Sequence, residues 1–262
     1  MLNFMTYSTS PDSFWFKNTE NLRHLRYCQT NDMFFCPFYQ PHPTSGALAI
    51  DRVRRIKRVE ENDFEKILIM VRRGFNYFAK YHPLETFDYI IQIPSSADLA
   101  PLLYDCAKEI SNEFNNAFFD KSNIVFSSKI LKKNLYKDLI VDNEMVQRSG
   151  TQITMDSVGS WYGNLKKYQG NETIQVKGIK ASYRRYATGY FSINPQEYIE
   201  NLHIANLYAS RKILLIDDTI GEGKTFLEAI KTLEGYAPIA KFVCFALVRD
   251  FPSLTLGAFG LR

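Results

Sequence analysis

The sequence is poor in the residues that build disulfide frameworks and metal centres. It has 4 cysteines among 262 residues, and no two of them have the C-x-x-C spacing of a zinc or redox site. Cys106 and Cys244 fall inside apolar runs, which predicts small buried hydrophobic residues. No run approaches the ~18 apolar residues of a membrane span, and the first residues lack the pattern of a signal peptide. We therefore expect a cytoplasmic protein without membrane association.

An excess of charge of one sign is also lacking. The formal net charge is +4, from 32 basic and 28 acidic residues, and the pI of about 8.7 lies below the value of about 9 that is typical of nucleic-acid-binding domains. The densest basic run, residues 51–58, is followed directly by a stretch, residues 60–65, with four acidic side chains. That order is typical of a solvated helix face with salt bridges, and a nucleic-acid or protein partner is the alternative. The 4 histidines are scattered, so no catalytic triad is predicted.

Core-forming residues, by contrast, are abundant. Hydrophobic residues make up 45% of the chain and aromatic residues 15%, which suits one large domain or a domain with an accessory piece. Residues 1–86 are irregular at first, and a helical pattern then covers Asp63–Tyr81. We interpret 1–86 as an accessory or hood segment and 87–262 as an α/β core. A long polar stretch at about 129–172 is interpreted as an insertion in that core.

In the second part of the chain, short apolar runs alternate with helical patterns. The predicted strands are Tyr89–Ile93, Ile124–Phe126, Tyr186–Ile193, Ile213–Ile216 and Phe242–Val248. Asp98–Ile110 and Thr225–Leu233 are the predicted helices between them. This alternation predicts an α/β fold with a mainly parallel sheet flanked by helices. We expect all of these strands except Tyr186–Ile193 to lie in that one sheet.

The segment Ile213–Thr225, with the sequence ILLIDDTIGEGKT, has the most specific chemistry. Its buried strand would deliver two adjacent carboxylates, Asp217 and Asp218, to the carboxyl edge of the sheet, where ligands of such folds bind. A loop with two glycines and a helix N-terminus follow, and their N–H groups favour an anion. The carboxylates can accept hydrogen bonds from a ribose diol. The segment therefore predicts a site for a ribose 5-phosphate group.

This segment resembles the 5-phosphoribosyl-1-pyrophosphate (PRPP) signature of type I phosphoribosyltransferases. That signature has apolar residues, two acids, a short spacer and a small-residue loop ending in Gly-x-Thr. The resemblance implies that Asp217 and Asp218 are catalytic, hold the ribose hydroxyls and bind Mg²⁺, directly or through the substrate. It assigns the 5′-phosphate to the loop residues Gly221, Glu222, Gly223, Lys224 and Thr225.

Two further segments are candidates for binding the pyrophosphate of PRPP. In the family that this chain resembles, a tight loop after the first core strand binds pyrophosphate, and Ser95 and Ser96 occupy that place here. Capping of the following helix is the alternative role of these serines. Arg184 and Arg185 end a basic turn before Tyr186 and resemble the family's mobile loop, since arginine binds phosphate oxygens bidentately. A solvated charge cluster is the alternative there.

These features predict a Mg²⁺-dependent phosphoribosyltransferase that glycosylates a nucleobase or another nitrogen acceptor and releases pyrophosphate. The alternative is a regulatory or effector module that binds PRPP or a nucleotide without turnover, which Glu222 beside the phosphate and the insertion favour. A nucleoside triphosphatase of the P-loop class is disfavoured, because it needs a glycine where this chain has Asp218. We also expect the chain to form a homo-oligomer.

Overall fold

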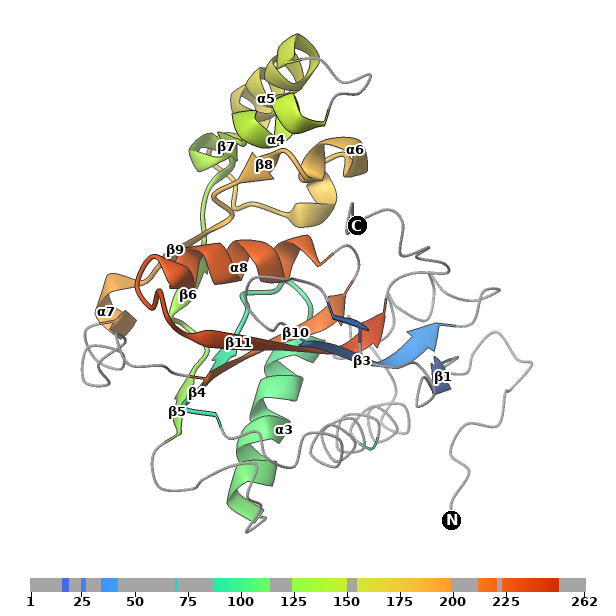
Figure 1. Cartoon of the computed structure of the whole chain (residues 1–262), viewed down its shortest axis with the longest axis vertical. Coiled ribbons are helices and arrows are strands. Elements are labelled where there is room, and N and C mark those ends of the chain that lie inside the picture. Colours follow the sequence, from blue (N-terminus) through green and yellow to red (C-terminus); the bar gives the residue numbers. More distant parts are fainter. Residues whose placement is uncertain are drawn as a thin grey trace. The chain divides into compact units, whose positions relative to one another are not determined.

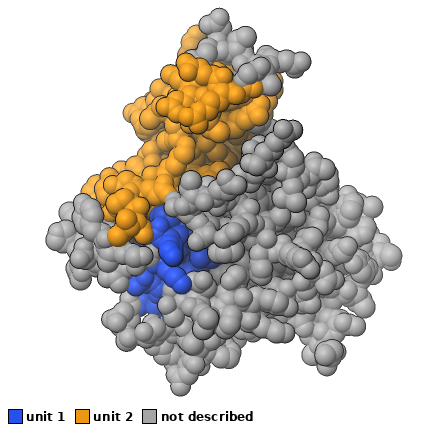
Figure 2. Space-filling view, in the orientation of Figure 1, with its two compact units in different colours: residues 1–128, 210–222, 240–262 blue, residues 129–209, 223–239 orange. Residues whose placement is uncertain are grey.

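A computed structural model describes the chain in several stretches, residues 16–18, 25–26, 34–41, 69, 87–113, 124–149, 155–198, 212–220 and 223–249 (Figure 1). The chain divides into two compact units (Figure 2). Unit 1 contains Met1–Ser128, Ser210–Glu222 and Ala240–Arg262, and unit 2 contains Lys129–Ala209 and Gly223–Ile239. Among the described residues, no helix is both long enough and apolar enough to cross a membrane.

Unit 1 is built on a mainly parallel sheet. Its strands follow one another in the order β1-β3-β11-β10-β4-β5, with β2 paired to β3. The run from β3 to β5 is parallel throughout, and β1 and β2 are antiparallel to β3. The strands are β1 (Phe16–Asn18), β2 (Leu25–Arg26), β3 (Phe34–Pro41), β4 (Tyr89–Gln92), β5 (Val125–Ser127), β10 (Lys212–Ile220) and β11 (Lys241–Arg249).

The centre of this sheet is formed by β10 and its two neighbours. Leu215 is in register with Cys244 of β11 on one side and with Ile91 of β4 on the other. All three side chains are fully buried, and those next to them along each strand are buried as well. Continuous burial on both faces is what parallel strands require, and it explains why unbroken apolar runs predicted these strands correctly.

Among the described residues of unit 1, a helix packs directly on the sheet. Helix α3 (Leu99–Glu113) contacts β10 and β4, and Figure 1 shows it against one face of the sheet. Leu99, Leu103 and Cys106 are buried on its inner side, at the spacing of three and four residues that one helical face requires. The predicted helix Asp98–Ile110 is confirmed, and so is the burial of Cys106 and Cys244.

Unit 2 is made of short elements. Two antiparallel pairs, β6 with β9 and β7 with β8, are accompanied by helices, of which α5 and α8 are the longest described. Its small core includes Val146, Val158 and Tyr186, with Trp161 and Tyr183 packed against it. The elements are β6 (Leu131–Lys133), η2 (Tyr136–Asp138), β7 (Ile140–Val141), α4 (Asn143–Arg148), α5 (Met155–Gln169), η3 (Val176–Gly178), α6 (Ala181–Arg184), β8 (Ala187–Thr188), β9 (Phe191–Ile193), α7 (Pro195–Glu197) and α8 (Lys224–Glu234).

Three features differ from the sequence-based expectations. The predicted single strand Tyr186–Ile193 is wrong, because Gly189 adopts a left-handed φ of 79° and divides it into β8 and β9, which pair with different partners. Strand β3 was not predicted, although it pairs in parallel with β11. Strand β10 continues beyond Ile216 to Ile220. The predicted helix Asp63–Tyr81 and the basic run 51–58 lie outside the described residues, apart from the helical Ile69.

Candidate functional site

The acid pair lies in the second half of β10. Ile216 is in register with Gln92, the last residue of β4, so Asp217 and Asp218 extend past the end of that neighbour. On the other side β10 stays paired with β11, with Asp217 opposite Ala246. The acids therefore lie at the carboxyl edge with respect to β4, as expected, but within the ladder with respect to β11. This pairing holds their backbone in extended conformation.

Both carboxylates are almost completely buried. Asp217 is 5% exposed and Asp218 is 1% exposed. The backbone N–H of Asp218 donates a hydrogen bond to Oδ1 of Asp217 at 2.9 Å. Because a buried charge is costly unless it is hydrogen-bonded, an arrangement of two adjacent carboxylates is unusual for a purely structural strand.

The loop after β4 reaches the acid pair from the neighbouring strand. Ser95 Oγ donates a hydrogen bond to Asp218 Oδ1 at 3.3 Å and accepts one from the Ala97 N–H at 3.1 Å. Just before the loop, the Ile93 N–H donates to the Ile216 carbonyl at 2.9 Å. Two candidate segments that are 123 residues apart in the sequence are thus in direct contact. Ser96, by contrast, has an exposed side chain.

Two further polar residues lie at the same edge, and the sequence analysis missed both. Gln92 ends β4 and is 7% exposed, and Ser127 ends β5 and is 4% exposed. With Asp217 and Asp218, they are the buried polar side chains described in unit 1, tyrosines aside. All four belong to the carboxyl ends of three adjacent parallel strands, where ligands of open α/β sheets bind. Each is a single polar residue at the end of an apolar run, a pattern that it shares with ordinary strand ends.

The glycine-containing segment that follows β10 begins helix α8 in unit 2. Gly223 is the N-cap of α8 with a φ of 71°, a left-handed conformation that favours glycine. Its carbonyl accepts the first helical hydrogen bond, from the Leu227 N–H at 3.0 Å. Thr225 is half-buried in the first turn. Gly221 and Glu222 lie outside the described residues.

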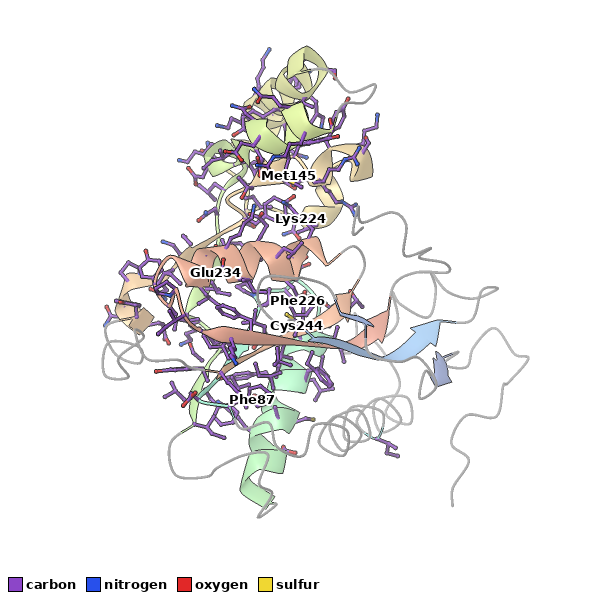
Figure 3. The ribbon with its side chains drawn as sticks, in the orientation of Figure 1. Phe87, Met145, Lys224, Phe226, Glu234 and Cys244 are labelled. Carbon is purple, nitrogen blue, oxygen red and sulfur yellow. The ribbon has the colours of Figure 1, made fainter. Side chains whose placement is uncertain are left out.

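Lys224 is engaged within its own helix. Its Nζ lies 2.9 Å from Oε1 of Glu228, one turn along, and 5.7 Å from the centre of the Tyr190 ring. Figure 3 labels Lys224 at the N-terminal end of α8. Burial lowers the pKa of the Lys224 ammonium below its usual value, and the Glu228 carboxylate opposes this shift. Thus the lysine that the resemblance assigns to the phosphate loop has a carboxylate partner in this structure.

The buried carboxylate of Glu228 accepts hydrogen bonds from several donors. Its Oε2 accepts hydrogen bonds from Thr188 Oγ1 at 2.8 Å and from the Gly189 N–H at 2.8 Å. This residue was not predicted from the sequence, because a charged side chain four residues after a lysine is typical of an exposed helix face. In this structure the carboxylate joins α8 to the turn between β8 and β9.

The two candidate arginines are also in unit 2. Arg184 Nε donates to the Ile179 carbonyl at 2.9 Å, and the Arg185 guanidinium lies 4.8 Å from the centre of the Tyr186 ring. The Arg185 side chain is exposed, whereas Arg184 is half-buried. Arg185 therefore has the accessibility that an anion-binding residue needs, while Arg184 is held by its own loop.

The polar side chains at the edge of the unit 1 sheet carry oxygen atoms that could bind a metal ion. Among the described residues, no group of three or more His, Cys, Asp or Glu side chains is arranged to hold a metal ion. The adjacent carboxylates of Asp217 and Asp218 are the acidic oxygens described there. Neither the family models nor the curated proteins with which the sequence was compared match this chain.

Proposed function

We propose that the protein is a phosphoribosyltransferase that transfers the 5-phosphoribosyl group of PRPP to a nitrogen acceptor and releases pyrophosphate. The observation that carries the proposal is the hydrogen bond between Ser95 and Asp218. The resemblance assigns these two segments to the two ends of one PRPP molecule, and in the sheet of unit 1 they meet. The buried Gln92 and Ser127, at the ends of β4 and β5, extend the same polar edge.

The roles of the residues follow from their chemistry. Asp217 and Asp218 accept hydrogen bonds from the ribose hydroxyls, and the resemblance assigns the 5′-phosphate to residues 221–225, which follow along the chain. The bond from the anomeric carbon to pyrophosphate breaks, and a bond to the acceptor nitrogen forms as that nitrogen loses its proton. Positive charge that develops on the ribose ring is complementary to the two carboxylates. The contribution of the chain is therefore mainly positioning and electrostatics.

The residues at this edge fit a magnesium ion that arrives with the substrate. Mg²⁺ prefers oxygen ligands and is usually held by one or two protein carboxylates together with substrate phosphates. Asp217 and Asp218 provide such carboxylates, while one oxygen of each already accepts a hydrogen bond. When bound, magnesium neutralises the charge of the departing pyrophosphate.

A second candidate function is a regulatory or effector module that binds PRPP or a nucleotide without turnover. The observation that favours it is the burial of both acids within a hydrogen-bonded strand, where each carboxylate already accepts a hydrogen bond. Such a site suits recognition of a ligand as well as catalysis. The two candidates share the ligand and differ in the chemical step.

One experiment separates these functions. The full chain is incubated with PRPP, Mg²⁺ and a panel of nucleobases, and pyrophosphate release is measured alongside binding of PRPP by calorimetry. We expect release with at least one base. Binding of PRPP without release from any base would support the module instead. Absence of both binding and release at millimolar PRPP would reject both candidates.

A further inference from the structure

We infer that Ser95 serves the ribose end of the proposed site, as a positioning residue for Asp218, although it lies in the loop that the resemblance assigns to pyrophosphate. The inference rests on the proposed function and assigns a specific role within it. The Ser95 hydroxyl has a single proton, and the direction of that proton is the basis of the inference. A serine hydroxyl has one O–H to donate, and here it points to Asp218 Oδ1 at 3.3 Å. In this geometry the same proton is not directed at a phosphate oxygen.

The acceptor side of the same hydroxyl is occupied as well. Ser95 Oγ accepts the Ala97 N–H at 3.1 Å, a local side-chain-to-backbone bond that fixes the turn between β4 and α3. Pro94 alone separates Ser95 from Ile93, whose N–H is bonded to β10 through the Ile216 carbonyl. The position of the Ser95 hydroxyl is therefore set from both sides, by the sheet before it and by the turn after it.

Because Asp218 is buried, its hydrogen bond with Ser95 matters for the orientation of the carboxylate. The side chain is 1% exposed, so water contributes little to its orientation and each donor from the protein counts. Ser95 supplies a donor from the loop after the neighbouring strand. A carboxylate held in this way presents its remaining oxygen lone pairs in a fixed direction. Loss of the Ser95 donor should therefore weaken the binding of the ribose hydroxyls by Asp218. Ser95 has this effect without a hydrogen bond of its own to the ribose.

Three ligands distinguish this role from direct binding of pyrophosphate. PRPP occupies both ends of the proposed site, ribose 5-phosphate lacks the pyrophosphate, and inorganic pyrophosphate lacks the ribose. Affinities of the full chain for each are measured by calorimetry with Mg²⁺. For Ser95→Ala, we expect PRPP and ribose 5-phosphate to bind more weakly by on the order of tenfold, the scale of one hydrogen bond to a charged group. Pyrophosphate should bind within about twofold of the parent.

Further variants separate the donor from the turn. Ser95→Thr keeps the hydroxyl and should restore the affinities. Ser95→Asp keeps an acceptor for the Ala97 N–H but removes the donor and places a second negative charge against Asp218, so it should lose ribose 5-phosphate binding more than Ser95→Ala does. Ser160→Ala is the control, because the side chain of Ser160 is exposed on helix α5 and no role in the site is assigned to it. It should leave the affinity for ribose 5-phosphate unchanged.

The possible outcomes have different meanings. If Ser95→Ala weakens PRPP and pyrophosphate but not ribose 5-phosphate, Ser95 is a direct pyrophosphate ligand and the inference is wrong. If the parent binds PRPP and Ser95→Ala binds all three ligands equally well, the inference is also wrong, while the proposed function stands. If the parent binds none of the three, the proposed function fails and the inference fails with it.

A ligand-independent measurement tests the contact itself. Unfolding free energies of the parent, Ser95→Ala, Asp218→Asn and the double variant form a double-mutant cycle. The effects of the two substitutions should not be additive if Ser95 and Asp218 are bonded. Additive effects would contradict the contact on which the inference depends.

Discussion

The two units each bury an acidic centre, and the two centres differ in what surrounds them. Glu228 of unit 2 is 1% exposed and faces the Lys224 ammonium at 2.9 Å, together with the Gly189 N–H. Asp218 of unit 1 is equally buried, and its Oδ1 accepts a hydrogen bond from the neutral hydroxyl of Ser95. A carboxylate matched with an internal cation supports the fold. Under the proposed function, the two adjacent carboxylates of unit 1 bind the hydroxyls of a ligand instead.

The largest expected effect concerns the centre in unit 2. Glu228→Gln should lower the free energy of unfolding by about 3–5 kcal/mol, because it leaves the buried Lys224 ammonium without its counter-charge. Urea unfolding measures this change. The matched control is Glu144→Gln, which breaks an exposed i,i+4 pair with Arg148 and should change stability by about 0.5 kcal/mol or less. Similar losses for the two variants would contradict the structural role of Glu228.

The centre in unit 1 should show the opposite behaviour. Asp217→Asn combined with Asp218→Asn should abolish PRPP binding, since both acceptors of the ribose hydroxyls lose their charge. The ligand-free variant should melt no lower than the parent, because removing adjacent like charges relieves repulsion. Differential scanning calorimetry with and without PRPP and Mg²⁺ tests both statements, since only the parent should show the rise in Tm expected from ligand binding. A variant that still shows this rise would exclude the acid pair from the site.

A backbone substitution affects the unit 2 centre more mildly. Gly189→Ala should destabilise the protein by about 1–2 kcal/mol, because φ at this residue is 79° and an added Cβ would lie 3.4 Å from the Asp138 carbonyl oxygen. The N–H of this residue also donates to Glu228. Gly163→Ala in helix α5 is the control, since its Cβ would meet nothing within 4 Å and the change should stabilise by about 0.5–1 kcal/mol. Thermal unfolding should therefore shift in opposite directions for the two variants.

The smallest expected effect is a pH dependence. Burial lowers the pKa of Lys224 from its usual value of 10.5, so the unfolded chain binds more protons than the folded one between the lowered pKa and 10.5. Stability from this residue should therefore rise with pH through that window. Lys224→Met should flatten the alkaline slope of the unfolding free energy relative to the parent, whatever its effect on the absolute value. Parallel slopes for the two proteins would show that Lys224 titrates normally.

How far the sequence predicts this structure depends on which interactions dominate locally. The apolar runs of β10 and β11 and the single buried face of α3 are strong local signals, and they were predicted with ends within a few residues. The meeting of Ser95 and Asp218 followed from strand order, because carboxyl ends of adjacent parallel strands share one edge. By contrast, Pro37 favours a turn on local grounds, yet it pairs with Ala246 within the sheet.

The residues that sequence reasoning missed depend on contacts far along the chain. Glu228 lies on an amphipathic helix, where its charge predicts exposure, and its burial depends on a turn 39 residues earlier. Gln92 and Ser127 are ordinary ends of strands until the sheet places them at the same edge as the acid pair. Nothing in the local sequence distinguishes such residues from boundary residues, since their role is created by strand order alone.

The extension of β10 through the acid pair also has a dynamic consequence. Because Asp217 is paired with β11 and the ladder continues to Ile220, the amide hydrogens of this stretch should exchange with solvent only when the central sheet opens. The two acids would then belong to the slowest-exchanging part of the fold, although binding residues usually lie on more mobile loops. The backbone of the two acids is already ordered when the protein folds. A ligand of the proposed site would therefore bind without the entropic cost of ordering that backbone.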